Sequence, residues 1–327
     1  MSRRDRKLKM TIAIAVIVLI VIVVAFLFLD KLLLHKLDPE LPTPKDAETL
    51  MNTISLPSGK YRLKDGVDNY LVIGLDSKGQ MASSESYTNT ERADFLILVS
   101  VDHDKKACRF MQINRDTMAY VPTISVTGKK KGVKVEQIAL AHTYGDGMSA
   151  SCFNTVDAVS NLLYGVDIDY YVAMTMDAVV NLTDFIGGVD MTMQDNYTEI
   201  DWRYTKGANV HLNGESALNF VRERRGLSDA TNIARQKRQN EFIDAFVETV
   251  KKERIGQDYI TEAYQSVSDY ILTNANTNKL YDLLSNINEY KFDSVITPKG
   301  TAQYTGEFVE FYIDADDLEG IIKNLFC

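Results

Sequence analysis

The sequence predicts an α/β fold in a single domain, because short runs rich in β-formers alternate with helical patterns up to the end of the chain. The composition is that of a globular protein, with 45% hydrophobic and 25% charged residues among 327, which excludes disordered and collagen-like classes. Residues 67–327 are numerous enough to bury one substantial core.

The N-terminal region carries a predicted membrane anchor. Thr11–Leu29 contains nineteen residues without a charge, and as a helix it would be about 28 Å long, close to the thickness of a bilayer's hydrocarbon core. It has no polar face and no small-residue cleavage pattern, so we expect one uncleaved transmembrane helix. Met1–Lys9 holds five basic residues and one acidic residue, a local charge of +4. The positive-inside rule therefore predicts a cytoplasmic tail over residues 1–10 and places everything beyond Asp30 outside the cell membrane.

Residues 30–66 are predicted to form an extended stalk, because they hold four of the six prolines, Pro39, Pro42, Pro44 and Pro57. The extracellular domain is expected over residues 67–327. Its predicted strands are Tyr70–Gly74, Asp94–Val101, Cys108–Ile113, Tyr170–Met176 and Val189–Met193. Its predicted helices are Phe153–Leu163, Ala178–Ile186, Gly214–Arg224, Ile233–Lys252, Leu280–Ile287 and Asp317–Phe326.

The cysteines and histidines indicate no metal site. The four histidines are scattered, and the three cysteines lack the spacing of zinc ligands. Cys108 and Cys152 are either a disulfide pair or two separate buried thiols.

Two carboxylates are predicted to meet at one edge of the sheet. Asp102–Lys106 is a polar turn between two apolar runs, so residues 94–113 read as a β-hairpin that brings Asp94 beside Arg115. If the strand ending before Asp76 runs antiparallel to it, Asp76 reaches the same edge. Facing carboxylates repel unless a cation lies between them, and a hard ion such as Mg²⁺ suits carboxylates and phosphates. The alternative is that Asp76 caps a turn and Asp94 pairs with Arg92.

A second cluster is basic and lies in residues 222–238. It contains Arg222, Arg224, Arg225, Arg235, Lys237 and Arg238. Arginine forks bind phosphate oxygens in pairs, so the cluster suggests an anion site, whereas a solvated helix face is the plainer interpretation. Without the N-terminal tail the net charge falls from -9 to -9 - 4 = -13, and this acidity disfavours nucleic acid as a partner.

The same residues carry a family resemblance. The chain resembles the LytR-CpsA-Psr family of membrane-anchored cell-envelope proteins, most clearly from Tyr70 to Phe246. The matching segments are YLVIGLDSKG (70–79), ERADFLILVSVD (91–102), MQINRDTMAYVP (111–122), AHTYGDG (141–147), the stretch 167–193, LNGESALNFVRERR (212–225) and ARQKRQNEF (234–242).

The resemblance implies a fold and an activity. The fold is a three-layer domain with a mixed central sheet flanked by helices and an apolar pocket for a prenyl chain. The activity is Mg²⁺-dependent transfer of a glycopolymer, such as a teichoic acid or capsular polysaccharide, from undecaprenyl pyrophosphate to peptidoglycan, which makes a phosphodiester. By position, Asp76 and Asp94 match the acidic pair associated with Mg²⁺, and with Arg115 they form the expected catalytic group. The expected pyrophosphate-binding residues are Arg92, Arg115, Arg222, Arg224, Arg235 and Gln236.

Three departures and two alternatives remain. Lys78 stands where the family usually has arginine, which preserves the charge but not the fork. The family usually has arginine where this chain has Asn232, so Asn232→Arg is expected to tighten binding of a prenyl pyrophosphate. The stretch Glu136–Ala139 replaces a Lys/Asn-containing segment before AHTYGDG. The same groups would also serve a polyprenyl-pyrophosphate hydrolase with water as acceptor, and a non-catalytic envelope regulator is the other alternative.

Overall fold

The computed structural model describes residues 53–327 except residues 85–86, 88, 224–231, 251–256, 276–288, 294 and 307. The expected tail, the expected anchor and the first part of the expected stalk lie outside these residues, as does the helix predicted over 280–287. No helix within the described part is both long enough and apolar enough to cross a bilayer.

A six-stranded mixed sheet forms the centre of the fold, in the order β11-β8-β3-β4-β5-β12. Its strands are β3 (Val67–Leu75), β4 (Ala93–Asp102), β5 (Ala107–Ile113), β8 (Tyr170–Met174), β11 (Ile271–Thr273) and β12 (Lys291–Phe292). The β4–β5 hairpin that the sequence predicted is confirmed, since Leu96 pairs with Ile113 and Asp102 pairs with Ala107. β3 runs antiparallel to β4 and parallel to β8, so the sheet is mixed.

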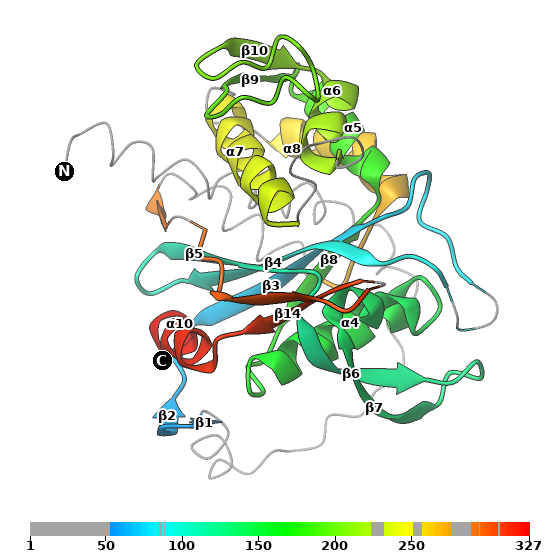
Figure 1. The fold of residues 1–327 in the computed structure, drawn as a ribbon, viewed down its shortest axis with the longest axis vertical. Helices are drawn as coiled ribbons and strands as arrows, with labels where there is room; N and C mark the ends of the chain where they lie inside the picture. Colours follow the sequence, from blue (N-terminus) through cyan, green and yellow to red (C-terminus); the bar gives the residue numbers. More distant parts are fainter. Residues whose placement is uncertain are drawn as a thin grey trace.

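Helices cover both faces of the sheet (Figure 1). On one face lie α5 (Met176–Phe185), α6 (Gly214–Arg222), α7 (Asn232–Val250) and α8 (Gln257–Val267). On the other lie α4 (Ser149–Leu162), α10 (Ala315–Phe326) and the 3₁₀ helix η2 (Ile138–Thr143); the short η3 spans Ser268–Tyr270.

Successive residues of each central strand enter two different hydrophobic cores. In β3, Tyr70 and Val72 pack into the α5–α8 core, whereas Leu71 and Ile73 pack into the α4–α10 core. This alternation follows from the two-residue period of a strand, and because both faces are covered, the strand reads as an unbroken apolar run.

Four two-stranded ribbons complete the fold. They are β1–β2 (Thr53–Leu56 and Gly59–Arg62), β6–β7 (Met118–Ile124 and Lys130–Gln137), β9–β10 (Val189–Thr192 and Asn209–Leu212) and β13–β14 (Gly300–Tyr304 and Val309–Ile313). The whole first ribbon falls in the expected stalk, but Ile54 and Leu56 are buried in the α4–α10 core, so the packed domain begins earlier than residue 67. The strand predicted over Val189–Met193 exists, although it lies outside the central sheet.

The predicted helices at 153–163, 178–186, 214–224, 233–252 and 317–326 correspond to α4, α5, α6, α7 and α10 with shifted ends. The thiols of Cys108 and Cys152 are both buried and form no disulfide, so the alternative of two separate buried thiols holds.

Candidate active site

The two predicted carboxylates lie at the end of β3 and the start of β4. A β-bulge falls between Gly74 and Leu75. There β4 crosses so closely that a Cβ on Gly74 would lie 2.9 Å from the Cβ of Phe95. Asp76 follows directly. Its backbone N–H donates to the carbonyl of Arg92 (3.1 Å), and its Oδ1 accepts from the Arg92 N–H (2.7 Å). This reciprocal pair closes the base of the loop between the strands and holds Asp76 near Asp94.

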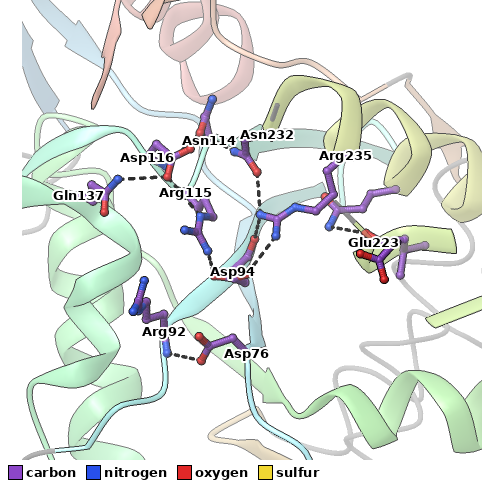
Figure 2. A network of polar contacts seen from close by, with 12 residues as sticks. Asp76, Arg92, Asp94, Asn114, Arg115, Asp116, Gln137, Glu223, Asn232 and Arg235 are labelled. Carbon is purple, nitrogen blue, oxygen red and sulfur yellow. Dashed lines mark hydrogen bonds and ion pairs between the residues drawn. The ribbon is translucent and has the colours of Figure 1, made fainter. Parts of the chain in front are cut away.

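Asp94 lies between two arginines from distant parts of the chain (Figure 2). Arg115 donates from Nη1 to Oδ1 of Asp94, and Arg235 donates from Nη1 to Oδ2 at 3.0 Å. Arg235 also donates from Nη2 to the Asp94 carbonyl at 3.1 Å. The side chains of Arg115 and Arg235 are only 11% and 4% exposed, so both ion pairs are largely shielded from water. The convergence of Asp94 and Arg115 is therefore confirmed, and Arg92 contacts Asp76 and Asp94 through its backbone.

A chain of amides supports this ion-pair cluster. Oδ1 of Asn114 accepts from the Asp116 N–H (2.9 Å) and from Nδ2 of Asn232 (2.7 Å). Oδ1 of Asn232 in turn accepts from Nη2 of Arg235 (2.6 Å). Asn232 is only 8% exposed, so its amide acts as both hydrogen-bond donor and acceptor while it is almost completely shielded from solvent.

On the other side of Arg115, Asp116 accepts from Nε of Arg115 (3.2 Å) and from Nε2 of Gln137 (3.1 Å). Asn114, Asp116 and Gln137 were not predicted as functional residues. Asn114 and Asp116 directly flank Arg115 in its motif, and this position is the sequence feature that could have identified them.

Burial and charge shift two pKa values in the site. Burial raises the pKa of Asp76, the backbone N–H of Arg92 lowers it, and the nearby Asp94 raises it, with an upward net shift. Burial alone would lower the pKa of Arg115, but the carboxylates of Asp94 and Asp116 outweigh this and raise it. The arginine therefore stays charged, and the site combines close cations with close carboxylates.

The basic cluster of residues 222–238 divides between several partners. Arg235 reaches Asp94, whereas Arg238 donates from Nε to the carbonyl of Phe220 (2.9 Å) and covers the end of α6. Lys237 pairs with Asp195 on the surface at 2.8 Å. Gln236 is buried on α7, Arg222 is exposed at the end of α6, and Arg224 lies outside the described residues.

An apolar cavity opens beside this cluster, between the sheet and α5, α6 and α7. It encloses about 980 Å³ of space between atoms, its mouth included. Its apolar walls include Val72, Ile97, Val179, Leu182, Phe242 and Phe246, and its polar lining consists mainly of Asp94, Arg222, Arg235 and Gln239. The cavity therefore suits a molecule with a long apolar tail and an anionic head.

Asp76 and Asp94 offer a donor set that fits Mg²⁺ in part. Among the described residues, no group of three or more His, Cys, Asp or Glu side chains could hold a metal ion. Mg²⁺ commonly uses one or two carboxylates together with substrate phosphates and water, so two facing carboxylates beside an anion site match that pattern.

Comparison with known proteins gives the site a family context. The family model described as the LytR_cpsA_psr family matches residues 43–325. The polyisoprenyl-teichoic acid–peptidoglycan teichoic acid transferase TagV of Bacillus subtilis is 27% identical over 246 residues, which cover 72% of this chain and 59% of TagV. TagU of Bacillus anthracis, which has the same activity in its name, is 25% identical over 219 residues, 66% of this chain and 63% of TagU. The chain thus spans less than two thirds of the length of these curated relatives.

The fold agrees with this comparison. The crystal structure of B. subtilis TagV superimposes with a TM-score of 0.59 at 26% identity, over 80% of this chain and 96% of that one. Since the family model covers most of the sequence, from residue 43 to residue 325, the chain belongs to the LytR_cpsA_psr family.

Proposed function

We propose that this protein transfers a glycopolymer from a polyisoprenyl-pyrophosphate carrier to peptidoglycan and leaves a phosphodiester link. One observation carries the proposal: Asp94, Arg222 and Arg235, from separate segments, line the polar part of an apolar cavity, and Arg115 pairs with Asp94 beside it. A prenyl chain would occupy the cavity, and its pyrophosphate would lie against Arg115, Arg222 and Arg235. The names of the TagU and TagV relatives support teichoic acid as the polymer.

In the proposed reaction, an acceptor hydroxyl oxygen attacks the phosphorus that carries the polymer. A new P–O bond forms, the bond from that phosphorus to the bridging oxygen breaks, and polyisoprenyl phosphate leaves. The hydroxyl proton passes to a carboxylate; both oxygens of Asp94 accept from arginines, which makes Asp76 the better placed acceptor. The arginines stabilise the charge that develops on the leaving phosphate, and their burial strengthens this effect.

We further propose that Asp76 and Asp94 hold Mg²⁺ when the donor is bound. The ion would act as a Lewis acid on the pyrophosphate oxygens. Arg115 and Arg235 would then orient the Asp94 carboxylate, since each donates to it. Arg224 and Gln236 remain candidates for the pyrophosphate site from the family resemblance, and Arg92 is a candidate from its position next to Asp76.

The location of this activity is also a proposal. The uncharged run at 11–29 and the basic residues before it support an anchor with the catalytic domain outside the cell membrane. Protease added to intact protoplasts should then digest the domain, and protection of the domain would contradict this topology.

The function is tested with the full-length protein in detergent, a lipid-pyrophosphate glycan and peptidoglycan fragments. We expect polymer to appear on the fragments together with polyisoprenyl phosphate, and almost none without fragments. Equal release of polyisoprenyl phosphate without fragments would instead identify a hydrolase. Donor binding without turnover under either condition would identify a binding protein.

A further inference from the structure

A strip of exposed side chains extends outward from the site along β7 and β14. It consists of the exposed Tyr304, Val309, Val135, Tyr120 and Val133 together with the half-buried Gln137, called here the outer strip. Tyr120 pairs with Val135 across β6–β7, and Tyr304 pairs with Val309 across β13–β14. The two side chains of each pair therefore lie side by side on the same face of their ribbon. Gln137, Val135 and Val133 follow one another at every second position and therefore share one face of β7.

The outer strip is continuous with the site. Nε2 of Gln137 donates to the carbonyl of Val309 at 2.7 Å and to Oδ1 of Asp116 at 3.1 Å. Asp116 in turn accepts from Arg115, so a molecule on the strip would lie one residue from the arginine that holds Asp94. Figure 2 places Gln137 and Asp116 across Arg115 from Arg235, whose helix α7 borders the cavity. The strip thus approaches the reacting groups from the side opposite the proposed donor.

The exposure of the outer strip is unusual for large apolar side chains. Tyr304 is 73% exposed, Tyr120 64% and Val135 58%. An exposed apolar patch next to a catalytic site commonly marks a binding surface. Tyrosine offers a flat apolar ring and a polar hydroxyl, the combination that stacks on the C–H face of a sugar ring while hydrogen-bonding its hydroxyls.

The charge around the outer strip also selects the partner. Lys129 and Lys131 are exposed at the outer end of the β6–β7 ribbon, although the domain as a whole is acidic, whereas Lys134 lies on the opposite face of β7 over the ring of Tyr144. Lys129 and Lys131 complement a polymer that carries carboxylates at intervals. The ribbon also presents Glu136, and Lys130 pairs with Asp157 at 2.9 Å. This mixture of charges disfavours an anionic bilayer, which attracts unbroken basic clusters.

We propose that the outer strip binds the acceptor: a glycan strand of N-acetylated amino sugars that bears carboxylate-containing peptides, the polymer of peptidoglycan. This inference rests on the proposed function and adds to it a separate acceptor surface. From Gln137 to Val133 the strip is about 14 Å long at the usual rise of a strand, enough for more than one sugar. Tyr120 and Tyr304 would stack on sugars on either side of the reacting one, and Gln137 would orient it toward Asp94.

The test uses the full-length protein in detergent and insoluble peptidoglycan stripped of attached polymers. The double variant Tyr120→Ser, Tyr304→Ser should co-sediment about tenfold more weakly than wild type, because exposed tyrosines often dominate such contacts. In the transfer assay its KM for peptidoglycan fragments should rise about as much, with binding of a prenyl pyrophosphate unchanged. Trp202→Ser removes an equally exposed ring elsewhere, 81% exposed, and should behave like wild type.

The outcomes separate this inference from the proposed function. Absence of transfer by wild type would overturn the proposed function. Transfer by wild type together with equal sedimentation and equal KM in the double variant would overturn the acceptor surface alone. A third arm replaces peptidoglycan with phosphatidylglycerol vesicles. If the double variant loses vesicle binding and keeps peptidoglycan binding, the strip is a membrane-docking surface and the inference is wrong.

Discussion

At the scale of single residues, Asn232 shows how a neutral side chain can serve a cationic site. It occupies the first position of α7, where the family resemblance leads us to expect arginine. Its amide donates to Asn114 and accepts from Arg235, and it is buried while doing so. The amide therefore positions Arg235 on Asp94, and the earlier expectation that arginine here would improve binding conflicts with this geometry.

We accordingly expect Asn232→Arg to weaken the protein rather than to tighten donor binding. The change removes two buried hydrogen bonds and places a second guanidinium beside Arg235, at a cost of about 2–4 kcal/mol in the free energy of unfolding. Chemical denaturation measures it. Ile233→Arg is the matched control, because Ile233 is 60% exposed on the same helix and should accept arginine at little cost. Equal stability of the two variants, with tighter prenyl-pyrophosphate binding by Asn232→Arg, would restore the first expectation.

Asp94→Asn should separate the role of the arginines from that of the metal. In EDTA, loss of the carboxylate leaves Arg115 and Arg235 available to phosphate, so a short prenyl pyrophosphate should bind about tenfold more tightly than to wild type. Added Mg²⁺ should tighten binding to wild type and leave the variant unchanged, as measured by calorimetry. Asp195→Asn removes a surface carboxylate from Lys237 and should respond like wild type. An equal response to Mg²⁺ in wild type and Asp94→Asn would exclude Asp94 as a ligand.

At the scale of elements, η2 holds the loop that carries Asp76 and Arg92. Asn89 donates from Nδ2 to the carbonyl of His142 at 2.9 Å, and Nδ1 of His142 lies 3.2 Å from the carbonyl of Glu91. His142 itself is fully buried, with Nε2 3.9 Å from Sγ of Cys152 on α4. Burial lowers the pKa of His142 to about 4. A neutral imidazole thus links the loop, η2 and α4.

This imidazole should make the fold sensitive to acid. The pKa of His142 is about 4 in the folded protein, compared with its ordinary value of 6.5, which applies in the unfolded state. The unfolded state therefore binds more protons between these values, and stability is lost as pH falls from about 6.5 toward 4. From pH 7 to pH 4.5 this group alone should remove about 2 kcal/mol from the free energy of unfolding.

His142→Gln should show a decline smaller by that amount, measured by urea denaturation at both pH values. If the free energy of unfolding falls equally in wild type and His142→Gln between the two pH values, His142 is protonated in the folded protein.

The elements differ in how far the sequence predicts them. β3, β4 and β5 are buried on both faces and read as continuous apolar runs, so their places and the Asp94–Arg115 contact follow from the hairpin alone. β7 is exposed over Lys130–Val135 and β13 over its whole length, so neither strand shows the long apolar run by which a buried strand is recognised. The Arg235–Asp94 and Asn232–Asn114 contacts join residues 141 and 118 positions apart. They depend on how α7 packs, which no local pattern encodes.

At the scale of the whole molecule, the two faces of the central sheet have different tasks. The α5–α8 core contains the cavity, and the α4–α10 core holds η2 and the α4 helix. The site lies where the two meet, at the ends of β3 and β4. A donor in the cavity and an acceptor on the outer strip would therefore reach Asp94 from opposite sides of the same sheet edge.

Ile243→Trp should discriminate between long and short donors. Ile243 lines the cavity on α7, and an indole there would occupy space that a long prenyl chain needs. We expect binding of a long-chain prenyl pyrophosphate to fall at least about tenfold, the equivalent of losing roughly two buried methylene groups, while a two-isoprene analogue binds as before. Ile233→Trp, on the exposed side of the same helix, is the control. Equal binding of both lipids to wild type and Ile243→Trp would show that the chain lies elsewhere.

The unequal filling of the two cores has a consequence for how the molecule tolerates change. A cavity forgoes contacts that a packed interior would make, so the α5–α8 half contributes less to stability than its size suggests. Each central strand is also shared with the well-packed α4–α10 half, which holds the strands in register whether or not the cavity is occupied. Substitutions that reshape the cavity should thus be absorbed without loss of the fold. Occupancy would then add stability where it is lowest, so donor binding should tighten α5, α6 and α7 more than α4 and α10.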